Sequence, residues 1–171
     1  NYLEEKVSKK EKFSQKLILD VQKLVEKGAS KEKIGLRGSM PPGVLFAVYD
    51  SKTGNPDYIP PEYCDIPELL DELVEYVNTT DDHPLIVAAV VHYQLVTIHP
   101  FEDGNGRTAR LLEKWFLAQK LGHKAWFIQS EKMYYNQHNT YYKNIRLLGL
   151  EYPELDYKQA LSFLLMLPTS I

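Results

Sequence analysis

The residues best suited to chemistry lie in one short stretch of the chain, His99 to Arg110, which reads HPFEDGNGRTAR. Within it, Gly104 and Gly106 flank Asn105 directly before an apolar segment that is typical of a helix. A glycine turn that leads into a helix N-terminus presents several backbone N–H groups in one direction, and these groups bind anions together with the helix dipole. Glycine also lets a phosphate approach the backbone closely. We therefore expect this turn to form a phosphate site.

Two arginines follow the turn at the start of the expected helix. Arg107 and Arg110 are three positions apart, so they share one face of that helix. A cation at a helix N-terminus opposes the dipole, and the arrangement becomes favourable when an anion lies between the two guanidinium groups. Guanidinium groups also match phosphate oxygens in geometry. Phosphate binding is therefore the functional interpretation, and a solvated helix face is the alternative.

A carboxylate and an imidazole precede the turn. Asp103 lies directly before Gly104, and Mg²⁺ typically takes one or two carboxylates together with substrate phosphates and water. His99 ends the preceding apolar segment and can act as a general base near neutral pH. Alone, the aspartate is typical of a turn and the histidine of a structural residue. It is their order within one stretch that favours a catalytic site.

Two helices are expected to position this stretch. Leu85 to Ile98 is rich in Val and Ile, which favours strands, but its length favours a buried helix. Asp82 is a candidate N-cap and Pro84 fits the first turn. A second apolar segment, 107–121, ends at Gly122 and predicts a helix as well. The chemical stretch is then the connection between two helices.

The remaining pattern is mainly helical. Helices are predicted over 13–27, 66–78, 130–148 and 157–167, and the glycine- and proline-rich segment 35–43 is predicted to be a loop. Val44 to Tyr49 is short and rich in β-forming residues, and Tyr58 with Ile59 is expected to be the returning strand of a hairpin. The predicted fold class is mainly α, with one β-hairpin, in a single domain.

Composition excludes several classes of protein. The net charge of −3 gives no general reason to expect a nucleic-acid partner, and the basic residues of 1–38 alternate with Glu and apolar residues as on a solvated helix surface. Cys64 is the only cysteine, so no intrachain disulfide forms and a reducing, cytoplasmic compartment is expected. No apolar run reaches the ~18–20 residues that a membrane span needs. The chain starts with Asn1, so we expect a fragment of a longer chain.

The stretch HPFEDGNGRTAR resembles the signature of the Fic (Fic/Doc) family, HxFx(D/E)GNGRxxR, at every fixed position. Segment 36–61 resembles the family's flap region, and segment 130–145 resembles its downstream helix with a pair of tyrosines. The resemblance implies a Fic-like helical core with the active loop between two central helices and a β-hairpin flap above it. It further implies one domain over 1–171, with an N-terminal helical segment at 1–35, the core at 36–167 and the flap at 44–59.

The resemblance also implies a function, which is transfer of AMP from ATP to a Ser, Thr or Tyr hydroxyl of a target protein, accompanied by self-modification. By that resemblance His99 is the base, Asp103 holds Mg²⁺ or Mn²⁺, and Phe101 anchors the loop. The phosphate-binding residues are then Gly104, Asn105, Gly106, Arg107 and Arg110, of which Arg107 steadies the triphosphate and Arg110 reaches its γ end. Other donors, removal of AMP, and a non-catalytic nucleotide-sensing or protein-binding module are the alternatives, and the intact His99 favours catalysis.

The flap and the tyrosines complete the expected site. The flap residues would hold the target as an added strand, and the alternative is a hairpin that only covers the core. These residues are Val44, Leu45, Phe46, Ala47 and Val48. The pair Tyr141 and Tyr142 is expected near the adenine, although Tyr134 and Tyr135 compete for that role and aromatic core packing is the alternative. His83 and His92 suggest a metal site, but their spacing matches no compact ligand set.

One feature of the family is missing from the sequence. Many members are restrained by a helix that carries (S/T)xxxE(G/N), whose glutamate pairs with the second signature arginine, here Arg110. No segment of the chain matches this pattern. The inhibitory helix is therefore expected from a segment upstream of Asn1 or from a partner protein, unless this member is unrestrained.

Overall fold

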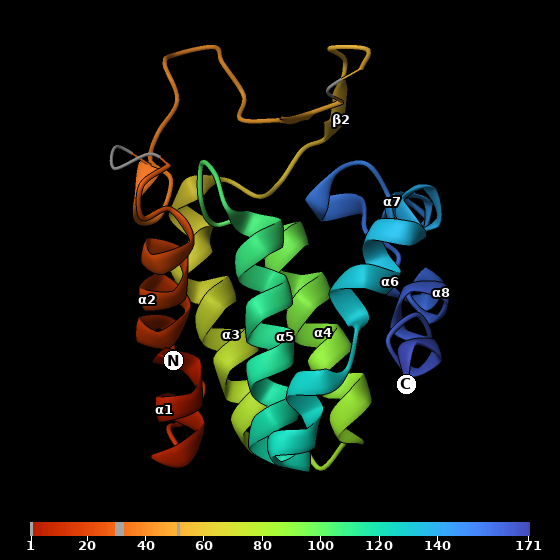
Figure 1. The fold of residues 1–171 in the computed structure, drawn as a ribbon. Coiled ribbons are helices and arrows are strands. Elements are labelled where there is room, and N and C mark those ends of the chain that lie inside the picture. Colours follow the sequence, from red (N-terminus) through yellow and green to blue (C-terminus); the bar gives the residue numbers. More distant parts are fainter. Residues whose placement is uncertain (1, 30–32, 51) are drawn as a thin grey trace.

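The computed structural model describes residues 2–29, 33–50 and 52–171. The predicted N-terminal segment and flap include residues 1, 30–32 and 51, which lie outside the described residues. The described chain is mainly helical with one two-stranded antiparallel sheet, as predicted (Figure 1). Its elements are α1 Tyr2–Ser8, α2 Gln15–Val25, β1 Val48–Tyr49, β2 Pro56–Tyr58, α3 Ile66–Thr79, α4 Pro84–Ile98, α5 Asn105–Leu121, α6 Ser130–Asn136, α7 His138–Arg146 and α8 Leu161–Leu164.

Helices α4 and α5 form the centre of the fold and run side by side in opposite directions (Figure 1). Helix α4 is apolar on nearly every side, which is typical of a helix enclosed by other elements. Their contact surfaces are fully buried, and they include Val91, Leu95, Ile98, Ala109, Leu112 and Trp115. The connection 99–104 lies at one end of this pair, so the core fixes the position of the chemical stretch.

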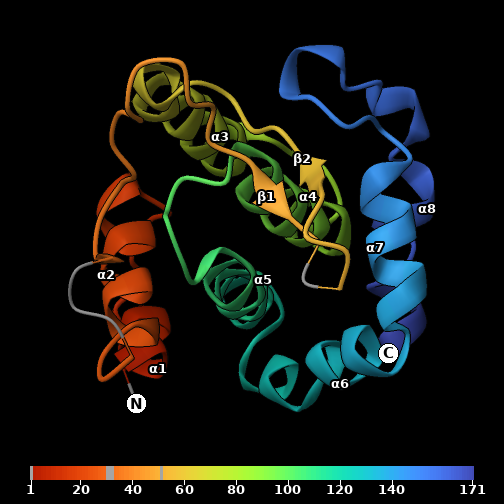
Figure 2. The same ribbon diagram turned by 90° about the horizontal axis from the view of Figure 1, so that it is seen from above.

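The other helices surround the central pair. Helix α2 packs against α5 on one side, and α3 packs against α4 (Figure 2). Helices α6, α7 and α8 lie on the opposite side from α2, and α8 packs against α4 and α7. A second buried cluster joins them to α4, and it consists of Tyr93, Tyr134, Tyr141, Leu148, Phe163 and Met166. The tyrosines on α6 and α7 are thereby held beside the N-terminal half of α5.

The hairpin extends over the connection between α4 and α5 (Figure 1). Its strands pair Val48 with Tyr58, and a bulge follows that pair. The β2 arm is tied down, because the Tyr58 hydroxyl donates to the Thr97 carbonyl at 2.7 Å and Asp57 forms an ion pair with Arg146. The other arm, 44–47, forms no strand, so the predicted strand from Val44 to Tyr49 is wrong except at its end.

Several predicted boundaries differ from the structure. The segment 130–148 is two short helices, α6 and α7, which join at Gln137. The segment 157–167 contains only a 3₁₀ turn and the single turn of α8. His83, not Asp82, caps α4, because its Nδ1 accepts from the Leu85 N–H. Apolar periodicity indicates helical residues but does not resolve a one-residue break such as the one at Gln137. Helix α1 was not predicted, since the first helix expected from the pattern began at Phe13.

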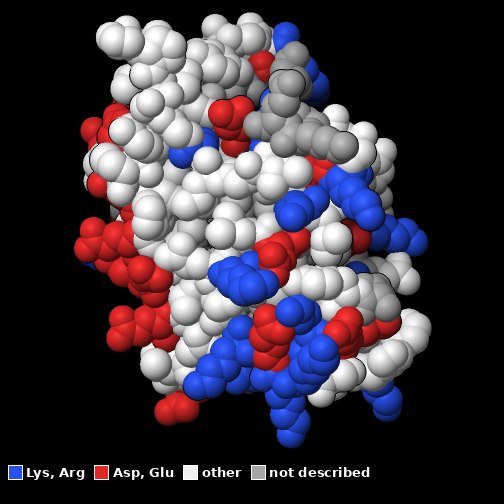
Figure 3. Space-filling view, turned by 90° about the vertical axis from the view of Figure 1, so that its left-hand side faces the viewer, with Lys and Arg blue, Asp and Glu red and all other residues white. Residues whose placement is uncertain are grey.

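The basic N-terminal helices carry a mixed-charge surface. Figure 3 shows this face, on which Lys and Arg side chains alternate with Asp and Glu. Ion pairs within this region join Lys6 to Glu11, Lys9 to Glu5 and Lys16 to Asp20. The arrangement agrees with the solvated helix surface that the sequence predicted. Within the described ranges, no helix combines the length and apolar character that a bilayer crossing requires.

Candidate active site

The loop between α4 and α5 is closed by its own residues. The side-chain amide of Asn105 accepts from the Phe101 N–H at 3.0 Å and donates to the Phe101 carbonyl at 2.8 Å. Phe101 is buried in the core and forms a bridge with Leu36, which lies upstream of the flap. The Asn105 side chain is therefore occupied within the protein. Any contact of Asn105 with a phosphate falls to its backbone N–H.

The imidazole of His99 lies at the hinge between α4 and the loop. Its backbone is left-handed, with φ 50 and ψ 58, and this conformation ends the helix. Nδ1 lies 3.3 Å from the Val96 carbonyl, so Nδ1 carries the hydrogen and Nε2 retains its lone pair. Burial lowers the pKa of His99 to about 4, and the nearby Arg37 adds to this effect. The ring is therefore neutral at physiological pH, as a general base must be.

Arg37 fixes the backbone of this hinge, and no local pattern of residues indicated this role. Its Nε–H donates to the His99 carbonyl at 2.8 Å, and its own backbone N–H donates to the Pro100 carbonyl at 2.9 Å. The guanidinium also lies over the Phe46 ring at 4.6 Å, and that ring is 6.0 Å from the His99 ring. Phe46 of the flap thus lies between the catalytic histidine candidate and a buried arginine.

The first signature arginine is engaged by a helix from the other end of the chain. Nη2 of Arg107 lies 2.7 Å from Oε1 of Glu26, which follows α2 and is completely buried. The same nitrogen lies 3.3 Å from Oδ1 of Asp103. Oε2 of Glu26 has no hydrogen-bond partner among the described residues. Sequence analysis missed Glu26, because it belongs to no local pattern and lies 81 positions before Arg107.

The glycines of the turn lie close to neighbouring side chains. Gly104 has a φ of +80, and a Cβ there would lie 2.5 Å from Oε1 of Glu26. A Cβ on Gly106 would lie 3.2 Å from Nη1 of Arg110, whose guanidinium folds back over the turn. Helix α5 begins at Asn105, so the amides of residues 105–107 have no carbonyl partner inside the helix. The turn therefore has the backbone geometry of an anion site.

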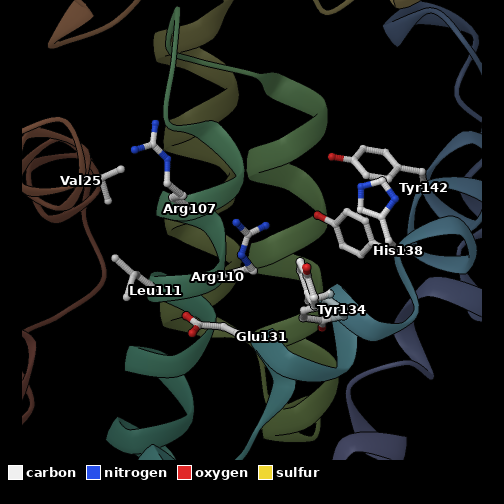
Figure 4. A pocket seen from close by; sticks show the side chains of 10 residues that line it. Val25, Arg107, Arg110, Leu111, Glu131, Tyr134, His138 and Tyr142 are labelled. Carbon is white, nitrogen blue, oxygen red and sulfur yellow. The ribbon is translucent and has the colours of Figure 1, made fainter. Parts of the chain in front are cut away.

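Two cavities meet at Arg110. The larger, about 530 Å³, lies between α5 and the α6–α7 segment and is lined by both signature arginines, Glu131 and four tyrosines (Figure 4). The smaller, about 150 Å³, lies beneath the hairpin and is lined by His99, Gly106, Arg110 and Val48. Tyr141 and Tyr142 line both. The imidazole of His99, the glycine turn and a hairpin residue thus share one small cavity, and a roomier pocket adjoins it.

A model of the Fic/DOC family matches residues 12–117, which is more than half of the chain and includes the whole stretch from His99 to Arg110. The chain belongs to the Fic/DOC family. The relatives known by name agree. Protein adenylyltransferase Fic of Drosophila yakuba is 37% identical over 93 residues, which are 53% of this chain and 18% of that protein. Protein adenylyltransferase fic-1 of Caenorhabditis elegans is 49% identical over 57 residues, which are 32% of this chain and 11% of that protein.

Solved structures show the same Fic fold. A Fic family protein from Desulfovibrio desulfuricans G20 aligns with a TM-score of 0.70 at 24% identity, over 90% of this chain and 43% of that one. Fic-1 from Caenorhabditis elegans aligns with a TM-score of 0.58 at 21% identity, over 93% of this chain and 41% of that one. The chain thus spans less than a fifth of the curated relatives that it matches.

The tyrosines of this Fic domain fall into two classes. Tyr141 is buried, and its hydroxyl lies 2.9 Å from Nε2 of His92. Tyr134 is also buried and donates to Glu113 at 2.8 Å. Tyr142 is 40% exposed and packs edge-on to Tyr141, while Tyr135 is 80% exposed at the pocket rim. Tyr142 therefore has the more accessible ring of the expected pair, and Tyr141 supplies a wall of the pocket.

The donor set of the Fic domain suits a metal that arrives with its substrate. Among the described residues, no group of three His, Cys, Asp or Glu side chains could hold an ion by itself. Asp103 is about half exposed, and its Oδ1 already accepts from the Gly104 N–H at 2.7 Å. One accessible carboxylate beside an anion site fits Mg²⁺, which takes few protein ligands and completes its shell with phosphates and water.

Proposed function

We propose that this Fic domain transfers AMP from ATP to the hydroxyl of a target protein. The observation that carries the proposal is the small cavity in which His99, the glycine turn and Arg110 meet beneath the hairpin. Mere nucleotide binding does not require a neutral imidazole beside the phosphate site. The names of the curated relatives, which are protein adenylyltransferases, support the same activity.

His99 would take the proton of the attacking hydroxyl. As that oxygen bonds to the α-phosphorus of ATP, the bond from the α-phosphorus to the bridging oxygen of the β-phosphate breaks and pyrophosphate leaves. Nε2 is the receiving atom, because Nδ1 faces the Val96 carbonyl. The low pKa of the free imidazole would rise once a triphosphate is bound nearby, since negative charge favours the protonated ring. General base catalysis of this kind contributes about 10²–10⁴-fold.

The glycine turn and the two arginines would hold the triphosphate. The free amides at the start of α5 and the guanidinium of Arg110 face the same cavity, so negative charge that develops on the leaving pyrophosphate is stabilised by groups already in place. Mg²⁺ or Mn²⁺, held by Asp103, would neutralise phosphate charge when bound. Tyr142 would contact the adenine in the larger pocket, with Tyr141 behind it.

The free arm of the hairpin would receive the target. Val44 and Leu45 are exposed, and no strand among the described residues pairs with the arm 44–47. An extended target segment would add to such an arm through main-chain hydrogen bonds and bring a hydroxyl near His99 without demanding a particular sequence. The same reach permits self-modification. We also propose a cytoplasmic location for the protein. Any inhibitory helix would come from an upstream segment or from a partner protein.

The decisive experiment is mass spectrometry of the purified domain after incubation with ATP and Mg²⁺. We expect an adduct with the mass of AMP on a Ser, Thr or Tyr side chain of the domain itself or of an added protein. Label in the α-phosphate of ATP should enter protein, whereas label in the γ-phosphate should not. Parallel reactions with GTP, UTP and CTP test the choice of donor. Transfer of label from the γ-phosphate, or a folded sample that forms no adduct with any nucleotide, would contradict the proposal.

A further inference from the structure

A chain of buried polar groups lies under the nucleotide pocket, outside the signature stretch. Nδ1 of His92 lies 2.7 Å from Oε2 of Glu113, and Nε2 lies 2.9 Å from the Tyr141 hydroxyl. The side chains of His92 and Glu113 have no solvent exposure. Because Nδ1 faces a carboxylate oxygen, it carries the hydrogen in the tautomer that satisfies both contacts, and Nε2 accepts from the Tyr141 O–H.

This chain ends at the second signature arginine. The Tyr141 hydroxyl gives its hydrogen to His92, so its lone pairs are available on the other side. The Arg110 guanidinium acts on that phenol and lowers its pKa, against the larger effect of burial. Both residues line the two cavities that meet above the turn. Nη1 of Arg110 thus approaches Gly106, and its guanidinium shares both cavities with the Tyr141 side chain.

Stability alone is a poor explanation for this arrangement. A buried histidine–carboxylate pair costs desolvation that well-packed apolar side chains would avoid. One oxygen of Glu113, Oε1, has no partner among the described residues. The rings of Tyr134, Tyr141 and Phe163 surround the His92 ring at 4.9 to 5.7 Å, so an apolar residue would pack there readily. The polar groups orient the Tyr141 hydroxyl: its hydrogen points toward His92, and its lone pairs point away from His92.

We propose that His92 and Glu113 are positioning residues that hold Arg110, through Tyr141, in the orientation that binds the phosphate end of the nucleotide. This proposal rests on the proposed function, because an effect on nucleotide affinity is expected only if the domain binds ATP. The orientation of Arg110 itself is a property of the ligand-free domain and is measured separately.

A double-mutant cycle on the affinity for ATP tests the connection. Tyr141→Phe keeps the ring and removes the hydroxyl, and we expect it to weaken ATP binding about tenfold in equilibrium dialysis. In an Arg110→Ala background the same change should have no further effect, because the group that it positions is gone. The loss should fall on the KM for ATP more than on the kcat of transfer, because the positioned group binds the nucleotide. An equal loss in both backgrounds would overturn the proposal.

Matched variants separate positioning from packing. Tyr93→Phe removes a buried hydroxyl that has no partner among the described residues, from the same cluster, and should leave ATP affinity unchanged. Glu113→Leu should match the loss in Tyr141→Phe, and Glu113→Gln should restore most of it, because an amide oxygen still accepts from His92. Equal losses in Glu113→Leu and Glu113→Gln, or in both phenylalanine variants, would contradict the proposal.

The ligand-free measurement is nuclear magnetic resonance of the Arg110 Nε–H group. We expect its exchange with water to be slow in the wild type and at least tenfold faster in Tyr141→Phe and Glu113→Leu, but not in Tyr93→Phe. This result, in a domain that fails to bind ATP, would refute the proposed function while supporting the positioning of Arg110. Identical exchange in all four proteins would refute the positioning even if ATP binds.

Discussion

The two signature arginines lie three positions apart on one helix, and each has a buried glutamate nearby, yet they are held in different ways. Arg107 contacts its glutamate directly, with 2.7 Å between Nη2 and Oε1 of Glu26. Arg110 is separated from Glu113 by the Tyr141 hydroxyl and the His92 ring. The first arrangement is an ion pair, and the second is a chain of hydrogen bonds.

The difference bears on what each arginine can offer to a phosphate. A carboxylate that already accepts from Arg107 competes with any anion that approaches, so a phosphate must exchange with Glu26 or share the guanidinium with it. Among the described residues Arg110 forms no ion pair with a carboxylate, unlike Arg107, so its charge stays available to a ligand. We infer that Arg110 is the main phosphate anchor and that Arg107 contributes less.

The two arginines have a catalytic role only if the reaction takes place at His99. His99→Ala should lower the rate of AMP transfer by about 10²–10⁴-fold, since the base is removed. Affinity for ATP should remain within about twofold of the wild type, because neither arginine contacts the imidazole. Rates come from radiolabel transfer and affinities from equilibrium dialysis. Near-normal transfer by this variant would remove His99 from the mechanism.

Replacing each arginine in turn tests their ranking. Arg110→Ala should weaken ATP binding by about 10- to 100-fold, the range for hydrogen bonds that involve charged groups. Arg107→Ala should weaken it by only about threefold, because its charge is already partly neutralised by Glu26. Dialysis with labelled ATP at one ionic strength compares the two. Equal losses of ATP affinity in the two variants would show that the arginines do not differ in this way.

Glu26→Gln should sharpen the difference. Glutamine keeps the shape and one hydrogen bond to Arg107 but removes the competing charge, so ATP should bind about three- to fivefold more tightly. Glu131→Gln is the matched control. Glu131 lines the larger pocket together with Arg107 but makes no direct contact with it (Figure 4). It should change affinity by less than twofold. An equal gain in both variants would indicate a general field effect instead of competition by Glu26.

The smallest expected effect is that of pH, and it acts through His99. The pKa of His99 is lowered to about 4, so its neutral form dominates from pH 5 upward and kcat/KM should stay nearly constant from pH 5 to 8. Phe46→Ala should expose the His99 ring and raise its pKa toward the ordinary histidine value of about 6.5. The pH below which kcat/KM falls should then rise with it.

Stability follows the same shift in pKa. Between pH 6.5 and 4 the imidazole binds a proton only in the unfolded chain, so its contribution to the free energy of unfolding is complete above that window and falls as pH falls through it. Denaturant titrations of the wild type and of His99→Gln at pH 5 and 7 measure this contribution. A pH dependence that is unchanged in the variant would show that the burial of His99 is not its cause.

Local patterns predicted much of the fold and one part of the site. The central helices follow from long apolar segments bounded by Pro84 and Gly122, and the loop between them follows from its glycines. The hairpin was predicted at the right place, but its first arm was not, because β-forming residues such as Val44 and Leu45 give a strand only where a partner strand is present.

The groups that hold the signature residues could not be predicted from one sequence. Arg37 lies 62 positions before the His99 carbonyl that it binds, and Glu26 lies 81 positions before Arg107. His92 occurs in an apolar helix, where its type alone does not reveal the carboxylate opposite. Such contacts depend on how α2, α4 and α5 pack together, and no spacing along the chain encodes that arrangement.

The amide of Asn105 has a consequence for the kinetics of binding. Because its oxygen and its nitrogen both bond to the backbone of Phe101, the turn holds its shape with no ligand present. The entropy of ordering this segment is lost when the chain folds, not when a nucleotide arrives. Entry into the turn then requires no rearrangement of the loop, and differences in affinity among nucleotides should appear in their residence times more than in their association rates.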